Sequence, residues 1–172
     1  RYGIRVLPPD INESEMNFHA VTDENGCHIR YGLLALKNVG EGMLRAAIRE
    51  RESGGRYRSF DDFLDRQAGG DLNKRQIEAL IKSGAFDSFP THRAQMLAVY
   101  EFMLDRKAER NRVNLEGQVD MFSVGADAAP ADTGMAYPQI KPFTMREKLM
   151  QEREASGMFF SGQLLDDYSD CV

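Results

Sequence analysis

The sequence predicts a mainly α-helical fold with a short β-hairpin near its N-terminal end. Between residues 33 and 104, apolar residues recur at a spacing of three and four, which is typical of helices that bury one face. Glycine-containing turns at 38–42 and 83–86 divide this region into two helix pairs. Apolar and polar residues alternate best before residue 32, so the hairpin is expected there.

The predicted hairpin follows an extended segment. Pro8-Pro9 fixes its own backbone and disfavours helix in the residue before it, so residues 6–12 are expected to be extended. Residues 17–21 and 27–31 have the alternation of two strands, and Asn25-Gly26 suits the turn between them.

The first helix pair consists of a short apolar turn at 33–36 and a helix that starts near Met43, on either side of the glycine-containing turn. Gly54-Gly55 ends the longer helix. Ser59 can cap a further helix over 60–66, with Asp62 as its capping-box partner.

The second pair consists of a helix over 73–82 and a long helix whose apolar face runs from Met96 to Leu104 before charge takes over. Residues 123–142 are rich in Ala, Gly, Pro and Asp and are expected to be a linker. A charged helix is predicted over 143–155, and residues 157–162 are predicted to form the first strand of a truncated domain. Because the chain starts at Arg1, we expect a piece of a longer protein.

The composition argues against several classes of function. The 172 residues carry a formal net charge of −5, the wrong sign for holding nucleic acid by bulk electrostatics, so any such contact must be local. Cys27 and Cys171 lie far apart without ligand spacing, which argues against zinc or disulfides and favours a reducing, cytoplasmic location. Neither a signal peptide nor a membrane-spanning segment is expected.

The first turn is a candidate phosphate site. Its glycines allow backbone N–H groups to point outward at the positive start of a helix, where an anion binds readily. Residues 37–58 hold six basic and three acidic side chains, a local charge of +3. The second pair places cations around Gly84, namely Lys74, Arg75, Lys82 and Arg93. Alternatively, the glycines only form tight turns and the cations are a solvated helix face.

The second candidate is the segment Gln118–Phe122. Met121 and Phe122 are large apolar residues in a segment with no core of its own, so they are expected to enter an apolar groove of a partner protein. Gln118 and Asp120 would then bond its polar rim. Alternatively, both apolar side chains fold back onto their own chain.

No catalytic or metal-binding arrangement is evident. The three histidines, His19, His28 and His92, lack ligand spacing, and the paired aspartates fit helix caps better than a metal site. Neither a phosphate-binding loop pattern nor a nucleophile elbow is present. The residues alone therefore predict a protein that binds and connects.

Several stretches together resemble the alpha subunits of bacterial DNA polymerase III, the class C replicative polymerases. They are residues 6–12, 29–33, 36–42, 80–87 and 117–122, with a weaker extension through 152–162. The resemblance implies four parts: the end of the fingers region with the hairpin (1–32), a tandem helix-hairpin-helix module (33–112), a flexible linker carrying a clamp-binding motif (113–142), and a helix leading into a truncated oligonucleotide-binding domain (143–172).

The resemblance also implies partners and site residues. The partners would be duplex DNA, held without regard to sequence, the sliding clamp, and other polymerase III holoenzyme subunits. Residues expected to contact DNA are Lys37, Asn38, Val39, Gly40, Glu41, Gly42, Arg45, Arg75, Lys82, Ser83 and Gly84, and those expected to bind the clamp are Gln118, Asp120, Met121 and Phe122. In this family the catalytic aspartates lie upstream, so we expect neither catalysis nor a cofactor here, and Mg²⁺ would bind elsewhere in the parent polymerase.

Two departures from the family pattern stand out. Asn38 replaces the first glycine of the first turn, and asparagine tolerates the left-handed backbone better than other non-glycine residues. Gln163-Leu164 stands where the family usually has His-Pro. Two other functions stay open: a helix-hairpin-helix interaction module of a repair factor, in which Met121 and Phe122 are core residues, and an error-prone paralogue of the polymerase.

Overall fold

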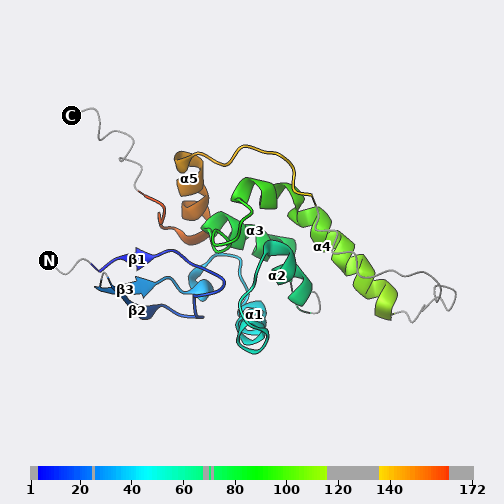
Figure 1. Cartoon of the computed structure of the whole chain (residues 1–172), viewed down its shortest axis with the longest axis horizontal. Coiled ribbons are helices and arrows are strands. Elements are labelled where there is room, and N and C mark those ends of the chain that lie inside the picture. Colours follow the sequence, from blue (N-terminus) through cyan, green and yellow to red (C-terminus); the bar gives the residue numbers. More distant parts are fainter. Residues whose placement is uncertain (1–3, 25, 68–69, 71, 116–135, 163–172) are drawn as a thin grey trace.

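The structure is a computed structural model that describes residues 4–24, 26–67, 70, 72–115 and 136–162. It confirms the mainly helical fold with a small N-terminal sheet (Figure 1). The strands are β1 (Val6–Leu7), β2 (His19–Asp23) and β3 (Gly26–Arg30). The helices are the 3₁₀ turn η1 (Leu33–Ala35), α1 (Glu41–Gly54), α2 (Phe60–Arg66), α3 (Lys74–Ser83), α4 (Arg93–Leu115) and α5 (Met145–Ser156).

The predicted hairpin is present but belongs to a three-stranded sheet. β2 pairs antiparallel with β3, with Val21 opposite His28, and β1 pairs parallel with the other edge of β3. The extended segment before Pro8 therefore supplies a third strand that the sequence did not predict. Two residues are too few to show alternation, and only the neighbouring strand reveals their pairing.

The core lies among the helices. The rings of Phe60 and Phe63 pack against that of Phe86, edge-on and tilted respectively, at centroid distances of 5.3 and 5.0 Å. The apolar faces of α1, α3 and α4 close around them through residues such as Leu44 and Ile77, both fully buried. Burying side chains of this size stabilises the fold by about 1.5 to 3 kcal/mol each. This core fixes the relative positions of the two turns.

Local signals set most helix ends. Ser59 accepts a hydrogen bond from the backbone N–H of Asp62 at the start of α2. Asn73 with Gln76, and Thr144 with Glu147, form complete capping boxes at α3 and α5. The predicted capping box of α2 is only half formed, because the Asp62 carboxylate accepts the N–H of Arg58 instead of that of Ser59.

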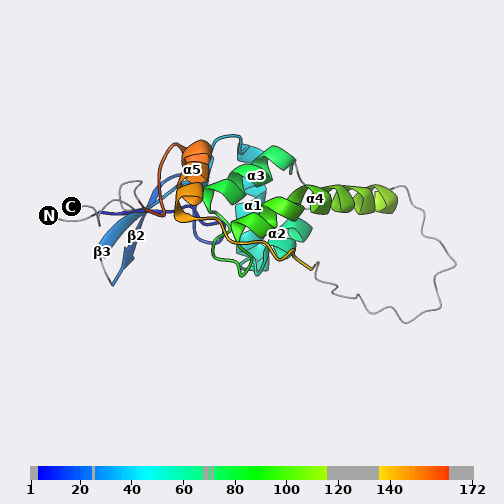
Figure 2. The same cartoon turned by 90° about the horizontal axis from the view of Figure 1, so that it is seen from above.

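α4 and the segment before α5 differ from the prediction. α4 continues to Leu115, and its C-terminal end projects beyond the helical body (Figure 2). The described end of the predicted linker packs against the body: Tyr137 Oη donates to Asp61 at 2.6 Å, and Gln95 Nε2 donates to the Pro138 carbonyl at 3.1 Å. Burial, together with the hydrogen bond to Asp61, raises the pKa of Tyr137.

The strand predicted over 157–162 is not formed. Gly157 ends α5 in the left-handed conformation, and the chain then turns back toward the helix. The N–H groups of Phe160 and Ser161 donate to the Glu152 carboxylate at 2.7 and 3.0 Å, and the Phe160 ring packs against Tyr31. Because these N–H groups bond to a side chain, they are not available to a strand ladder.

Candidate nucleic-acid interface

The first turn lies on the surface between η1 and α1. Asn38 has φ 62°, and it is the one non-glycine residue with positive φ in the described part of the chain. The expectation that asparagine would take the left-handed backbone here is therefore confirmed. Lys37 and Asn38 are exposed, whereas the side chain of Val39 is buried. Val39 thus anchors the turn, and only its backbone could reach a ligand.

The start of α1 has no side-chain cap. Gly40 is its N-cap residue and offers no side-chain acceptor, whereas α2, α3 and α5 are each capped by a side chain. The first helical hydrogen bond runs from the Leu44 N–H to the Gly40 carbonyl, which leaves the N–H groups of Glu41, Gly42 and Met43 without helical acceptors. Such donors at the positive end of a helix suit a phosphate oxygen.

The cations predicted around this turn divide into two groups. Lys37, Arg45 and Arg49 are exposed, although Arg45 also forms an ion pair with Glu41 one turn earlier. Arg51 is different, because its guanidinium bonds Glu15 at 2.9 Å and backbone carbonyls of residues 11 and 14. Arg51 therefore holds the N-terminal segment in place, and the local excess of available positive charge is smaller than the sequence indicated.

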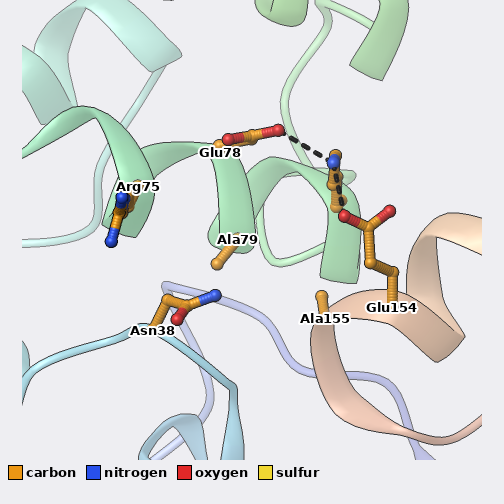
Figure 3. A pocket seen from close by; sticks show the side chains of 7 residues that line it. Asn38, Arg75, Glu78, Ala79, Glu154 and Ala155 are labelled. Carbon is orange, nitrogen blue, oxygen red and sulfur yellow. Dashed lines mark hydrogen bonds and ion pairs between the residues drawn. The ribbon is translucent and has the colours of Figure 1, made fainter.

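A depression of about 220 Å³ lies beside the first turn, between that turn, α3 and α5 (Figure 3). It brings together three residues predicted to contact DNA: Asn38 from the turn, and Arg75 and Lys82 from α3. Its other lining residues are Glu78, Ala79, Glu154 and Ala155. The first turn and α5 are also joined directly, because the Lys37 N–H donates to the Ala155 carbonyl at 2.8 Å.

Lys82 is held by two carboxylates in this depression. Its ammonium lies 2.8 Å from Glu78 on its own helix and 2.8 Å from Glu154 on α5, the ion pairs drawn as dashed lines in Figure 3. Burial lowers the pKa of Lys82, but the hydrogen bonds to Glu154 and Glu78 outweigh this effect, so the pKa is raised. Lys82 is therefore charged and already paired.

The second turn is buried. Ser83 is fully buried and donates to the Leu80 carbonyl, and Gly84 ends α3 in the left-handed conformation. A Cβ atom on Gly84 would lie 2.4 Å from the guanidinium of Arg93. Arg93 in turn binds Asp87 and the buried Glu152 of α5. The second turn is thus closed by its own neighbours.

Ser83 and Gly84, at the second turn, were predicted to contact DNA, and that contact stays a prediction. Ser83 and Gly84 do not lie on the surface, because α5 packs on α3 and the Arg93 side chain covers the glycine. Periodicity revealed the turn but not the helix over it, since α5 lies some 60 residues later in the chain. Of the residues predicted to contact DNA, the exposed ones are Arg75 and those near the first turn other than the buried Val39 and the half-buried Gly40.

The clamp-binding prediction lies outside the described residues. Gln118, Asp120, Met121 and Phe122 fall between Leu115, the end of α4, and residue 136, where description resumes. Among described residues, no group of three or more His, Cys, Asp or Glu side chains could hold a metal ion. No helix in the described ranges has the length and apolar character to cross a membrane.

Sequence reasoning missed two acidic residues of the interface, Glu78 and Glu154. Carboxylates give no positive signal for a phosphate-binding surface, and the Lys82–Glu154 contact joins residues 72 positions apart. The spacing of Glu78 and Lys82 at i and i+4 was visible, and it predicts an ion pair along one helix face. The partner on α5 carried no comparable signal.

A left-handed turn, a helix start without a side-chain cap and adjacent cations are together typical of a helix-hairpin-helix element. Comparison with known proteins agrees: a family model described as "Helix-hairpin-helix motif" matches residues 3–96, more than half of the chain. The chain therefore belongs to the helix-hairpin-helix family.

The chain is also similar to one segment of DNA polymerase III subunit alpha from many bacteria, which confirms the resemblance found in the sequence. It is 39% identical to the protein of Saccharopolyspora erythraea over 96% of this chain, and 36% identical to that of Escherichia coli K12 over 98%. The protein of Vibrio cholerae is 37% identical over 96%. In each case the chain spans about 14% of the relative's length.

Proposed function

We propose that this chain is a non-catalytic segment of a replicative DNA polymerase that grips duplex DNA through its phosphate backbone. The observation that carries the proposal is the open start of α1 beside an exposed left-handed turn, in a chain homologous to the polymerase subunit. Three backbone N–H donors at the positive helix end can hold a phosphate oxygen without any side chain reading a base.

The exposed cations support the same grip. Lys37 lies directly before the turn, and Arg75 reaches the same surface from α3, across the depression from Asn38. Arginine and lysine contacts to phosphate release counterions from the duplex, so they strengthen binding at low salt and carry no sequence information. The net charge of −5 then keeps the rest of the surface from binding DNA.

The test is duplex binding as a function of salt. Binding of a fluorescent duplex should weaken steeply between about 50 and 200 mM salt, with equal affinity for unrelated sequences. Lys37→Gln combined with Arg75→Gln should lower both the affinity and the salt slope. Binding that does not depend on salt, or that prefers one sequence, would contradict a backbone grip.

We further propose that residues 118–122 tether the polymerase to the sliding clamp. Support comes from the residue pattern, in which Met121 and Phe122 are apolar anchors and Gln118 and Asp120 are polar flanks. The segment that carries them follows the projecting end of α4 and precedes the packed residues 136–138, so it is attached to the body on both sides. Anchor residues of this kind supply most of the binding energy in a groove.

The tether is tested by capture on an immobilised bacterial sliding clamp. Met121→Ala with Phe122→Ala should weaken binding by about 2 kcal/mol or more, because both anchors leave the groove. Val124→Ala with Met135→Ala removes apolar side chains from the same segment and should leave binding unchanged. Equal clamp affinity for the wild type and the Met121/Phe122 double variant would refute the tether and leave the DNA grip standing.

The whole polymerase supplies the remaining context of the proposal. Nucleotide transfer, the Mg²⁺ that it uses, the other holoenzyme subunits and a cytoplasmic location are all expected of the longer protein, and this chain would contribute grip and processivity. Helix-hairpin-helix modules of repair factors would use the same turn. The similarity along almost the whole chain to polymerase subunits favours the replicative role.

A further inference from the structure

The depression beside the first turn contains a charge arrangement that a DNA grip does not require. The depression is lined by two cations, Arg75 and Lys82, and by two carboxylates, Glu78 and Glu154, so its formal charge is zero. A surface that binds phosphate gains from every free cation and loses from every carboxylate close by. A carboxylate such as that of Glu154 should therefore weaken phosphate binding at this surface.

We propose that Glu154 is an electrostatic brake on DNA binding, because it pairs with Lys82 and competes with phosphate for that ammonium. The proposal rests on the proposed function of the first turn. In this proposal α5 helps to set the affinity for duplex DNA. Lys82 contacts phosphate only after its ion pair with Glu154 opens.

The geometry singles out Glu154 over Glu78. Glu78 lies one turn before Lys82 on α3 and moves with it, whereas Glu154 comes from a different helix. Its side chain is 65% exposed, while that of Lys82 is 19% exposed. Glu154 is thus held by little besides the lysine, and the pair lies on the solvent side of the α3–α5 contact.

α5 does not depend on this pair for its position. The buried contact between Arg93 and Glu152, 2.9 Å long, joins α5 to the start of α4, and the Lys37 N–H bonds to the Ala155 carbonyl. Leu149 and Ala155 are buried in the same interface. An exposed ion pair on the rim of such an interface contributes about 0 to 1 kcal/mol to stability, so it can open without moving the helix.

A phosphate bound over Asn38 and Arg75 would offer Lys82 a third acceptor, besides Glu78 and Glu154. Once Lys82 turns from Glu154 to the phosphate, the duplex gains one further counterion-releasing contact, but the freed carboxylate then repels the same backbone. The competition of Glu154 for Lys82 and this repulsion both make duplex binding weaker with Glu154 than without it. Removal of its charge should strengthen binding and add a contact at the same time.

The experiment compares duplex affinity and salt slope for four forms of the chain: wild type, Glu154→Gln, Lys82→Gln with Glu154→Gln, and Glu109→Gln. Glu109 is a matched control, because its side chain is 62% exposed, it also pairs with an arginine on its own helix, and α4 supplies no residue to the depression. Circular dichroism verifies that all four forms are folded.

We expect Glu154→Gln to bind duplex about three- to tenfold more tightly, with a salt slope steeper by about one. Adding Lys82→Gln should cancel both gains, and Glu109→Gln should match the wild type. If the wild type binds in a salt-dependent manner and Glu154→Gln binds equally, the brake is overturned and the grip stands. An equal gain for Glu109→Gln would overturn the brake as well, because a general charge effect would explain it.

If neither the wild type nor Glu154→Gln binds duplex at low salt, the proposed function fails first, and the brake fails with it. The salt slope of the wild type therefore separates the two failures. A gain in affinity that survives the Lys82→Gln substitution would contradict the part of the proposal that concerns the lysine.

Discussion

The two helix-connecting turns of this chain share glycines and neighbouring cations but differ in what covers them. At the first turn, α1 starts without a side-chain cap and Asn38 is exposed. At the second, Gly84 is buried beneath Arg93, which α5 holds through Glu152. A sequence motif therefore does not make a binding surface by itself. The packing of a third element decides whether the turn faces a ligand or the interior.

The largest expected effect concerns the buried pair at the second turn. Glu152→Ala should lower the free energy of unfolding by about 3 kcal/mol or more, because Arg93 and two backbone N–H groups lose a buried acceptor. The measurement is urea unfolding followed by circular dichroism. Glu154→Gln, on the exposed rim of the same helix, should stay within about 0.5 kcal/mol of the wild type. Equal losses for both variants would remove the distinction between covered and open turns.

The next effect separates backbone strain from packing. Gly84 and Gly157 both end helices with similar left-handed backbones, at φ 85° and 81°. Gly157→Ala meets no atom within 4 Å, so it should cost about 1 to 2 kcal/mol from conformation alone. Gly84→Ala must also displace Arg93 and should cost about 1 kcal/mol more by the same unfolding measurement. Similar losses of unfolding free energy for the two variants would show that the Arg93 side chain moves away without measurable cost.

The buried pair also predicts a pH dependence. Burial raises the pKa of Glu152, but hydrogen bonds from Ser161, Phe160 and Arg93 outweigh burial, so its pKa in the folded state is lowered. The stabilisation is therefore complete above the ordinary glutamate pKa of the unfolded chain and is lost as pH falls toward the folded value. The Tm of the wild type should therefore fall more on acidification than the Tm of Glu152→Gln. Parallel pH profiles would contradict this role.

At the open turn, effects on DNA binding should exceed effects on stability. Arg75→Gln should weaken duplex binding about threefold and reduce the salt slope by about one, because one phosphate contact is lost. The control Arg110→Gln makes the same charge change on the exposed surface of α4 and should leave binding unchanged. Ser83→Ala, at the covered turn, should also bind DNA like the wild type. A loss for Ser83→Ala matching that for Arg75→Gln would show that the two turns do not differ in access.

The smallest effect tests the backbone of the open turn. Asn38→Gly should change unfolding free energy by only a few tenths of a kcal/mol, because glycine takes the φ of 62° without strain. Asn38→Ala should cost about 1 kcal/mol, since alanine disfavours the left-handed region. A larger loss for glycine than for alanine would mean that the asparagine side chain, and not its backbone, holds the turn.

The sequence by itself determined what depends on residues close together in the chain. The Ser59 cap of α2, the left-handed Asn38 and the alternation in β2 and β3 are all set within a few residues, so local patterns reveal them. The family could also be predicted from the sequence, because several stretches along the chain resemble the polymerase subunit in the same order. The open start of α1 could also be expected, because Gly40 has no side chain to cap it.

Only the tertiary structure decided which turn is covered and which cations are available. Arg51 bonds the N-terminal segment 36 residues or more away, and Lys82 meets Glu154 across 72 residues. The pairing of β1 with β3, and the turn after α5 that binds Glu152, depend in the same way on neighbours distant in sequence. Such contacts form only after the core fixes the elements in space, and charge periodicity along one helix carries no information about the helix that packs against it.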